Sequence, residues 1–243
     1  MGNRESMFIE TMGNSFILDI LENSLLINIE QGMNIYHLLS QAILLKIPGD
    51  VVELGCYDGL TAALMQKTLD QYKCNKKLHI YDSFEGLPKK TKSDGNTTFQ
   101  EGDFKTIKHA LIHNFKILNL EIPEIHAGCF KDTLPTQLPE KICFAHLDGD
   151  FYSSIKESLE YIYTKLSKGA IVVIDDYCAP EIHKQIQHKL NSNQRNLHNR
   201  RVYKVEDILP GVKKACDKFF KHKKERVSVL IAGDERHGYF RKQ

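Results

Sequence analysis

The sequence predicts an α/β fold, a three-layer sandwich around a mostly parallel seven-stranded sheet that ends in an antiparallel hairpin. Residues 142–147 and 170–174 are nearly continuous apolar runs, which are typical of strands covered on both faces. A helical pattern lies between these runs, so the three segments predict a βαβ unit with parallel strands. The 243 residues are enough for one domain with a sizeable core.

The helical pattern between the two strands has apolar residues at the spacing of one helix face, at Ile155, Leu159, Ile162 and Leu166. Ser154, with Glu157 three residues later, resembles a capping box, which gives helix N–H groups an acceptor. Gly169 can adopt the left-handed conformation that ends a helix. We therefore expect this helix to run from about Ser154 to Lys168.

Residues 1–47 predict two or three helices, which we interpret as an N-terminal helical cap or lid on the domain formed by residues 48–243. Their apolar residues recur at mostly helical spacing, and the positions expected to be buried are Ile17, Ile20, Leu21, Tyr36, Leu38, Leu39, Ala42 and Leu45. The sequence PGD at 48–50 then breaks the pattern and starts a strand at 51–54.

A glycine turn, Gly55-Cys-Tyr-Asp-Gly59, connects this first strand to a helix that begins near Thr61. Glycines let the backbone approach a ligand closely, and the helix N-terminus favours an anion such as a phosphate or a carboxylate. The spacing ExGxxxG differs from the GxGxxG of dinucleotide sites. The next strand, at 78–81, ends at Asp82, an acid placed to accept hydrogen bonds from ribose hydroxyls.

The remaining elements follow from the same signals of periodicity, glycine and proline. They are a polar loop at 89–102 beside the site, a helix around 104–115, a third strand ending near 126–128, a helix at 211–222 with Pro210 at its first position, and a hairpin of 226–232 with 237–241. Residues 178–209 carry few apolar side chains, and we expect an insertion there, either helical or a lid, near the ligand site.

Both strands of the βαβ unit end in acidic residues, LDGD at 147–150 and IDDY at 174–177. Parallel strands present their carboxyl ends at one edge of a sheet, where open α/β folds bind ligands, so the acids should converge. Clustered carboxylates repel one another, and a hard dication such as Mg²⁺ or Ca²⁺ relieves the repulsion. The alternative is helix capping and solvated loop acids, and Asp150 in particular is typical of a cap or turn.

The composition narrows the class of protein. A net charge of +2 gives no electrostatic reason to expect a nucleic acid partner, although residues 213–226 are basic. The six cysteines show no CxxC spacing and suit a reducing compartment, and we find no secretory signal or apolar run of membrane-spanning length. We expect a soluble cytoplasmic protein with no membrane partner.

Three histidines have patterns of their own. His109 and His113 share a helix face and could bind zinc, but without a further ligand in view a solvated pair is the simpler interpretation. His146 stands within an apolar strand and is expected to be a core histidine.

Five segments together resemble the successive motifs of class I S-adenosylmethionine-dependent methyltransferases, namely ELGCYDG (53–59), YDSFEGLP (81–88), HAGCF (126–130), LDGD (147–150) and IDDY (174–177). More narrowly, YDSFEGLP, LDGD, IDDY and PGVKKACD (210–217) resemble the macrocin-type family of sugar O-methyltransferases. The resemblance covers roughly residues 48–177 and 210 to the end of the chain, and it implies a Rossmann-like fold.

The resemblance implies S-adenosylmethionine as cofactor and gives roles to the matching residues. The methionine end would be lined by Glu53, Gly55, Tyr57, Gly59 and Thr61, and the ribose would be held by Asp82, with Ser83 beside it. The adenine would be bordered by Gly128, Cys129 and Phe130. The family also implies a Mg²⁺ site formed by Asp148, Asp175 and Asp176, with Asp148 beside the cofactor and a candidate general base.

The chain departs from the family pattern at two places. The family commonly has Trp-Arg in the first glycine turn, where this chain has Tyr57-Asp58. The family also passes quickly from IDDY to its Pro-Gly helix, whereas residues 178–209 intervene here.

The predicted function is transfer of a methyl group from S-adenosylmethionine to a hydroxyl of a sugar or another small diol-bearing metabolite, assisted by Mg²⁺. One alternative is a metal-independent methyltransferase that acts on another nucleophile. Another is a non-catalytic or nucleic-acid-binding protein on the same fold, with the basic residues of 181–226 as its surface. The glycine spacing disfavours a nicotinamide dehydrogenase. The identity of the acceptor and a homo-oligomeric state both stay open.

Overall fold

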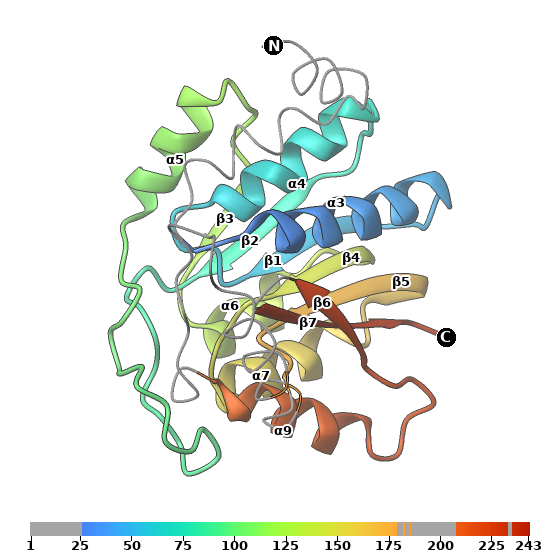
Figure 1. Ribbon diagram of the computed structural model, residues 1–243. Helices are drawn as coiled ribbons and strands as arrows, with labels where there is room; N and C mark the ends of the chain where they lie inside the picture. Colours follow the sequence, from blue (N-terminus) through green and yellow to red (C-terminus); the bar gives the residue numbers. More distant parts are fainter. Residues whose placement is uncertain (1–25, 179–181, 183–184, 186–207, 233–234) are drawn as a thin grey trace, which may run out of the picture.

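The computed structural model describes residues 26–178, 182, 185, 208–232 and 235–243. They form a three-layer sandwich in which helices cover both faces of a seven-stranded sheet (Figure 1). The strand order is β3-β2-β1-β4-β5-β7-β6. These strands are β1 (Asp50–Leu54), β2 (Leu78–Asp82), β3 (Glu124–Ala127), β4 (Ile142–Leu147), β5 (Leu166–Asp175), β6 (Ser228–Ala232) and β7 (Glu235–Arg241).

The sheet is parallel from β1 to β5, and β7 pairs antiparallel with both β5 and β6. The strand order reverses at β1, which has β2 on one side and β4 on the other. In open α/β sheets such a reversal marks the place where ligands bind, outside the carboxyl ends of the strands. The predicted fold, a Rossmann-like sandwich with a C-terminal antiparallel hairpin, is confirmed.

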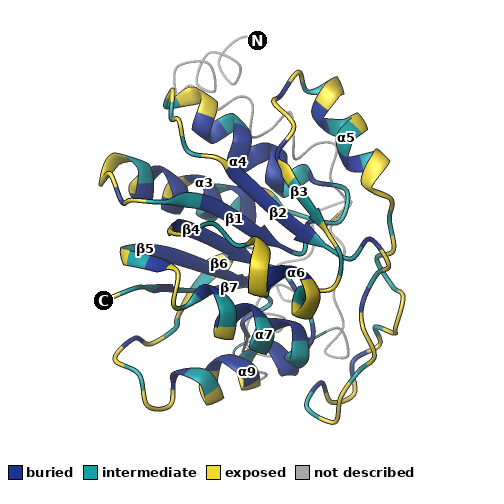
Figure 2. Ribbon diagram, turned by 180° about the vertical axis from the view of Figure 1, so that it is seen from behind, coloured by how far each residue is buried: buried dark blue, intermediate teal, exposed yellow. Residues whose placement is uncertain are grey.

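The helices divide between the two faces of the sheet (Figure 1). On one face lie α3 (Ile29–Leu44) and α4 (Leu60–Gln71), with α5 (Lys108–Ile117) beyond α4; on the other lie α6 (Phe130–Gln137), α7 (Tyr152–Ile162) and α9 (Pro210–Phe220). The central strands are therefore buried on both sides, as the dark blue ribbon in Figure 2 shows, and every residue of β4 is buried. Each large apolar side chain buried in this way contributes about 1.5–3 kcal/mol.

Helix α3 is one of the helices predicted within residues 1–47. The Asn28 and Gln31 side chains each accept a hydrogen bond from the other residue's backbone N–H, which makes a capping box. Leu45 is exposed, contrary to prediction, because the helix has already ended; the positions confirmed as buried are Tyr36, Leu38, Leu39 and Ala42. Ile17, Ile20 and Leu21 lie outside the described residues. The division of the chain at residue 47 stays a prediction.

Helix α7 is shorter than predicted and is capped differently. It runs from Tyr152 to Ile162 and gives way to β5, so the predicted end at Lys168 was wrong. Ser154 does not cap it, because the acceptor comes from a distant loop: Asp94 Oδ1 accepts a hydrogen bond from the Tyr152 N–H at 2.6 Å. The glycine that was expected to end the helix lies inside β5, where the register with β4 shifts.

Two further helices differ from the prediction. Helix α5 begins at Lys108, later than expected, since Phe104 has φ 59° and cannot belong to a helix. Helix α6 was not predicted, because it contains Pro135 and has few apolar residues; Leu134 nevertheless packs in the core.

The C-terminal elements agree with the prediction. Helix α9 carries Pro210 in its first turn, where the missing N–H of proline leaves no helical hydrogen bond unmade. The hairpin of β6 and β7 is antiparallel and completes the sheet. The insertion predicted at 178–209 lies almost entirely outside the described residues.

All six cysteines are free thiols. Burial raises the pKa of Cys143 to about 11 and that of Cys216 to about 12, so these thiols stay protonated and pack as small apolar groups. Within the described ranges, no helix has both the length and the hydropathy needed to cross a bilayer.

Candidate functional site

A cavity with a volume of about 880 Å³ lies at the carboxyl ends of β1, β2, β4 and β5. Small-molecule pockets typically have volumes of about 300–1,000 Å³, so this one has room for a cofactor and a second small molecule. Its walls come from the glycine turn after β1, the segment 82–88, the loop near 99–104, residues 129–131, and the acids that follow β4 and β5.

The glycine turn is shaped by two positions that other residues would not fit. Gly55 has φ +88°, and a Cβ added there would lie 1.8 Å from the carbonyl oxygen of Asp148. Gly59 has φ +82°, precedes the first turn of α4, and packs against the Leu111 side chain. The close approach at Gly55 places the start of the turn directly beside the end of β4.

Asp82 joins the end of β2 to the glycine turn. Its Oδ2 accepts hydrogen bonds from the N–H groups of Cys56 at 2.9 Å and Tyr57 at 3.0 Å, and its Oδ1 accepts one from Phe84 at 2.8 Å. Oδ2 thus accepts two hydrogen bonds and Oδ1 only one, so Oδ1 keeps acceptor capacity for a ligand in the cavity, which Asp82 and Ser83 line. This acid therefore orders the turn and can also hold a ligand.

The other residues predicted to bind a cofactor fall into two groups. Cys129 and Phe130 line the main cavity, and Gly128 just before them donates its N–H to the Asp82 carbonyl oxygen at 2.8 Å. Glu53 and Thr61 line a smaller cavity of about 50 Å³ behind the glycine turn. The structure thus brings together at the main cavity Gly55, Tyr57, Asp82, Ser83, Cys129, Phe130 and Asp148.

The acids after β4 and β5 converge, as predicted, but the grouping is new. Asp148, Asp150 and Asp176 each offer a carboxylate oxygen, and these oxygens lie within 4.8 Å of one another. Asp175 also lines the cavity, but it pairs with His237 Nε2 at 2.7 Å and accepts a hydrogen bond from the Gln31 amide at 3.3 Å. In the converging group the structure therefore has Asp150 where the prediction had Asp175.

The backbone at the acidic cluster adopts an uncommon conformation. Asp150 has φ 56° and Asp176 has φ 55°, values in the left-handed region that residues other than glycine rarely adopt. Such conformations cost about 1–3 kcal/mol each and concentrate at functional sites. The sequence indicated only that Asp150 turns the chain, and the structure shows that the same turn directs its carboxylate into the cluster.

The electrostatics of the cluster favour a bound cation. Removal from water and repulsion by the neighbouring carboxylates raise the pKa of Asp148 well above its usual value and that of Asp150 to about 7. Burial opposes ionisation of Asp175 too, but His237, His146 and Gln31 together outweigh burial and lower its pKa. An all-carboxylate donor set is the kind that Mg²⁺ and Ca²⁺ prefer, so the residues present fit a hard dication.

A buried polar network supports the cluster from below. His146 is a core histidine, as predicted, and its Nδ1 lies 2.9 Å from Glu53 Oε1. The His146 ring meets the His237 ring edge to face, with centroids 6.2 Å apart. The sequence did not lead us to His237 or Gln31. The antiparallel pairing of β7 with β5 sets His237 opposite Asp175, so this pairing is the signal from which His237 could have been found.

Comparisons with known proteins agree with this geometry. Mycinamicin III 3''-O-methyltransferase of Micromonospora griseorubida is 30% identical over 166 residues, which cover 64% of this chain and 65% of that protein. Demethyldecarbamoylnovobiocin O-methyltransferase of Streptomyces niveus is 31% identical over 171 residues, covering 64% and 63%. The matched region therefore spans slightly less than two thirds of either relative.

Solved structures show the same fold. The O-methyltransferase NovP superimposes with a TM-score of 0.67 at 22% identity, over 89% of this chain and 81% of that one. The calicheamicin methyltransferase CalS11 gives a TM-score of 0.61 at 20% identity, over 96% and 92%. A family model described as Macrocin-O-methyltransferase (TylF) matches residues 27–206, which is most of the chain. The protein belongs to the Macrocin-O-methyltransferase (TylF) family.

Proposed function

We propose that the protein is an S-adenosylmethionine-dependent O-methyltransferase that acts on a hydroxyl of a sugar or another small diol-bearing metabolite. The observation that carries this proposal is one cavity that holds both the Asp82-ordered glycine turn and the acidic cluster of Asp148, Asp150 and Asp176. The family supports it, since relatives bear names of O-methyltransferases for mycinamicin III and demethyldecarbamoylnovobiocin.

The cofactor would lie along the carboxyl ends of β1, β2 and β3. In this arrangement Asp82 accepts hydrogen bonds from the ribose hydroxyls with Ser83 beside it, and the adenine lies against Cys129 and Phe130, which follow Gly128.

The methionine end of the cofactor passes Gly55 and Tyr57 and reaches Asp148. Its carboxylate is attracted by the N-terminus of α4, with Gly59 and Thr61. Glu53 supports this end from behind the turn, through its hydrogen bond with His146.

Asp82→Asn tests the cofactor part of the proposal. Asparagine offers one acceptor oxygen where aspartate offers two, so either a backbone N–H of the turn or a ribose hydroxyl loses its partner. A hydrogen bond to a charged group is worth about 1.5–3 kcal/mol, so affinity for S-adenosylhomocysteine should fall by about 10–150-fold. Isothermal titration calorimetry measures the affinity of the wild type and of the variant for S-adenosylhomocysteine.

A matched control for this change is Asp103→Asn. Asp103 also accepts a hydrogen bond from a backbone N–H, that of Gln100, but it does not line the cavity. If Asp82→Asn and Asp103→Asn bind S-adenosylhomocysteine equally well, Asp82 does not hold the cofactor.

We also propose that Asp148, Asp175 and Asp176 hold Mg²⁺, with Asp150 completing the cluster. When bound, the ion would lower the pKa of an acceptor hydroxyl that touches it. The sulfonium already activates the methyl group, so the chain has to align the hydroxyl and remove one proton, which is the role proposed for Asp148. His237 and Gln31 position Asp175 by fixing its carboxylate.

Asp176→Asn tests the metal site. The variant should bind Mg²⁺ at least about tenfold more weakly in calorimetric titrations carried out with S-adenosylhomocysteine present, because the negative charge of one of the converging side chains is lost. Asp132→Asn, an exposed acid on α6, is the control and should titrate like the wild type. Full methyl transfer by the wild type in excess chelator would instead favour a metal-independent methyltransferase.

A further inference from the structure

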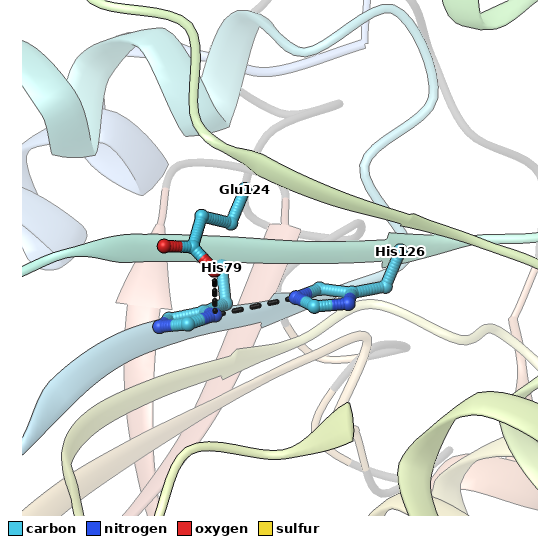
Figure 3. Close-up of side chains that lie close together, drawn as sticks. All are labelled: His79, Glu124 and His126. Carbon is cyan, nitrogen blue, oxygen red and sulfur yellow. Dashed lines mark hydrogen bonds and ion pairs between the residues drawn. The ribbon is translucent and has the colours of Figure 1, made fainter. Parts of the chain in front are cut away.

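Three potential metal ligands gather on β2 and β3 (Figure 3). Strand β3 is the edge of the sheet, and its pairing with β2 sets Glu124 opposite His79 and His126 two residues farther along. Residues two apart in a strand share a face, so all three side chains point to the same side of the sheet. One donor atom of each lies within 4.8 Å of the other two.

The two imidazole rings face each other through nitrogen atoms. His79 Nδ1 lies 3.2 Å from His126 Nε2, and Glu124 Oε2 lies 3.6 Å from the same His79 nitrogen (Figure 3). The other oxygen of Glu124 pairs with Lys77, which keeps the carboxylate ionised and leaves Oε2 for the histidines.

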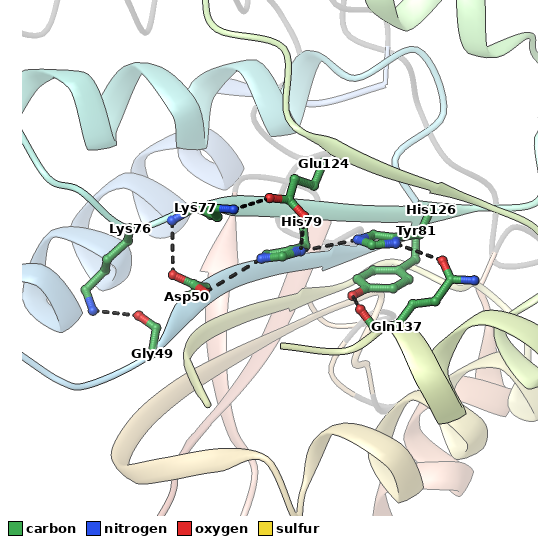
Figure 4. Close-up of polar contacts among 9 residues, drawn as sticks. All are labelled: Gly49, Asp50, Lys76, Lys77, His79, Tyr81, Glu124, His126 and Gln137. Atoms are coloured by element: carbon green, nitrogen blue, oxygen red, sulfur yellow. Dashed lines mark hydrogen bonds and ion pairs between the residues drawn. The ribbon is translucent and has the colours of Figure 1, made fainter. Parts of the chain in front are cut away.

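The outer nitrogen of each ring faces an oxygen atom (Figure 4), within hydrogen-bond distance for His126 but beyond it for His79. His126 Nδ1 lies 2.8 Å from the side-chain oxygen of Gln137, and His79 Nε2 lies 3.7 Å from Asp50 Oδ2. If each ring keeps its proton on that outer side, both facing nitrogens carry lone pairs. Two lone pairs 3.2 Å apart, beside a carboxylate oxygen, repel unless a cation lies between them.

The spacing suits a tetrahedral metal. Zinc–nitrogen bonds of about 2.0–2.1 Å at tetrahedral angles place two ligand nitrogens about 3.3 Å apart, close to the separation seen between His79 and His126. Two histidines and one carboxylate, with water in the fourth position, form a known zinc donor set. The contact between His126 and Gln137 at 2.8 Å matches the outer partners that orient metal-binding histidines, and Asp50 lies 3.7 Å from the outer nitrogen of His79.

We propose that His79, Glu124 and His126 bind a divalent transition-metal ion of the zinc class, at a site separate from the acidic cluster. None of the three lines the main cavity. His79 precedes Asp82 by three residues, about 10 Å along an extended strand. The donor sets differ as well, since imidazole nitrogen favours zinc and carboxylate oxygen alone favours magnesium.

The ion would join the edge strand β3 to β2 and, through Gln137, to the end of α6. His126 lies two residues before Gly128, whose N–H donates to the Asp82 carbonyl oxygen at the start of the cavity wall. Binding at the edge therefore stabilises the fold and holds residues 128–130 in place. By mass action, Zn²⁺ should raise the melting temperature of the protein.

The test compares Zn²⁺ binding by the wild type and by His79→Gln/His126→Gln, after removal of metals with chelator and with excess Mg²⁺ to occupy the acidic cluster. The double variant should bind one equivalent fewer. His109→Gln/His113→Gln, which removes two exposed histidines from α5, is the matched control and should keep the wild-type stoichiometry.

A second variant keeps the test independent of folding defects. Glu124 is half-exposed on the edge strand, so Glu124→Gln should fold, bind Zn²⁺ at least about tenfold more weakly, and show a smaller rise in melting temperature with Zn²⁺. The proposal is overturned if Zn²⁺ binds the wild type and both test variants with equal stoichiometry and affinity. It is equally overturned if the wild type binds no Zn²⁺, because the rings would then share a proton.

Discussion

Asp148→Asn is expected to lower the rate of methyl transfer by about 10²–10⁴-fold, the usual contribution of general acid–base catalysis, while S-adenosylhomocysteine still binds. The amide is close in shape to the carboxylate but cannot take the proton of an acceptor hydroxyl. Single-turnover rates with a diol-bearing sugar acceptor measure the first effect, and calorimetry measures the second. Asp132→Asn should match the wild type in both.

The same substitution should also stabilise the protein when no metal is added. The pKa of Asp148 is raised by burial and by Asp175, Asp150 and Asp176, so its ionised form weakens the fold at neutral pH. Each kcal/mol of relieved repulsion should raise the melting temperature by about 2–4 °C, and added Mg²⁺ should remove the difference from the wild type. A wild-type rate in Asp148→Asn would end its candidacy as the base, and Asp150→Asn would then be the next variant to measure.

Gly55→Ala is expected to destabilise the fold by more than about 4 kcal/mol, the range of exceptional single substitutions. The added Cβ would lie 1.8 Å from the backbone carbonyl oxygen of Asp148, and neither strand end can move aside without breaking the pairing of β1 with β4. Urea unfolding, followed by circular dichroism, gives the change in the free energy of unfolding.

Gly102→Ala is the control that separates the clash from the backbone strain. Gly102 has φ +85°, nearly the value at Gly55, but an added Cβ there meets nothing within 4 Å. Its substitution should cost only the left-handed penalty of about 1–2 kcal/mol. Equal losses in the two variants would mean that the contact between Gly55 and Asp148 has no energetic weight.

Much of the fold can be predicted from the sequence because its signals are local. Strand β4 is buried on both faces, so its residues form one apolar run, and Pro210 marks the start of α9 by its own chemistry. Helix α6 escapes prediction because it packs through few side chains and contains a proline. An element that is held by tertiary packing and has no local pattern of its own cannot be predicted from the sequence in this way.

The site is predictable to the level of which residues meet, but less so in how they are oriented. The order of parallel strands brings Asp82, Asp148 and Asp176 to one edge, and this follows from topology alone. The partner of Asp175 depends on His237, which is 62 positions away in the sequence and reaches it only through the register of β7. A turn residue such as Asp150 shows its position in the sequence but not the direction of its carboxylate.

The hydrogen bond by which Asp94 caps α7 limits how the loop at 89–102 can be exchanged to change the methyl acceptor. Asp94 is buried, its other oxygen holds the N–H and hydroxyl of Thr91, and a Cβ added to Gly211 would lie 2.2 Å from its Oδ1. The loop at 89–102, the start of α7 and the start of α9 are thus interlocked at one point. A chain that carries a loop grafted from a relative should keep the acids after β4 in place only if it has both an aspartate at position 94 and a glycine at position 211.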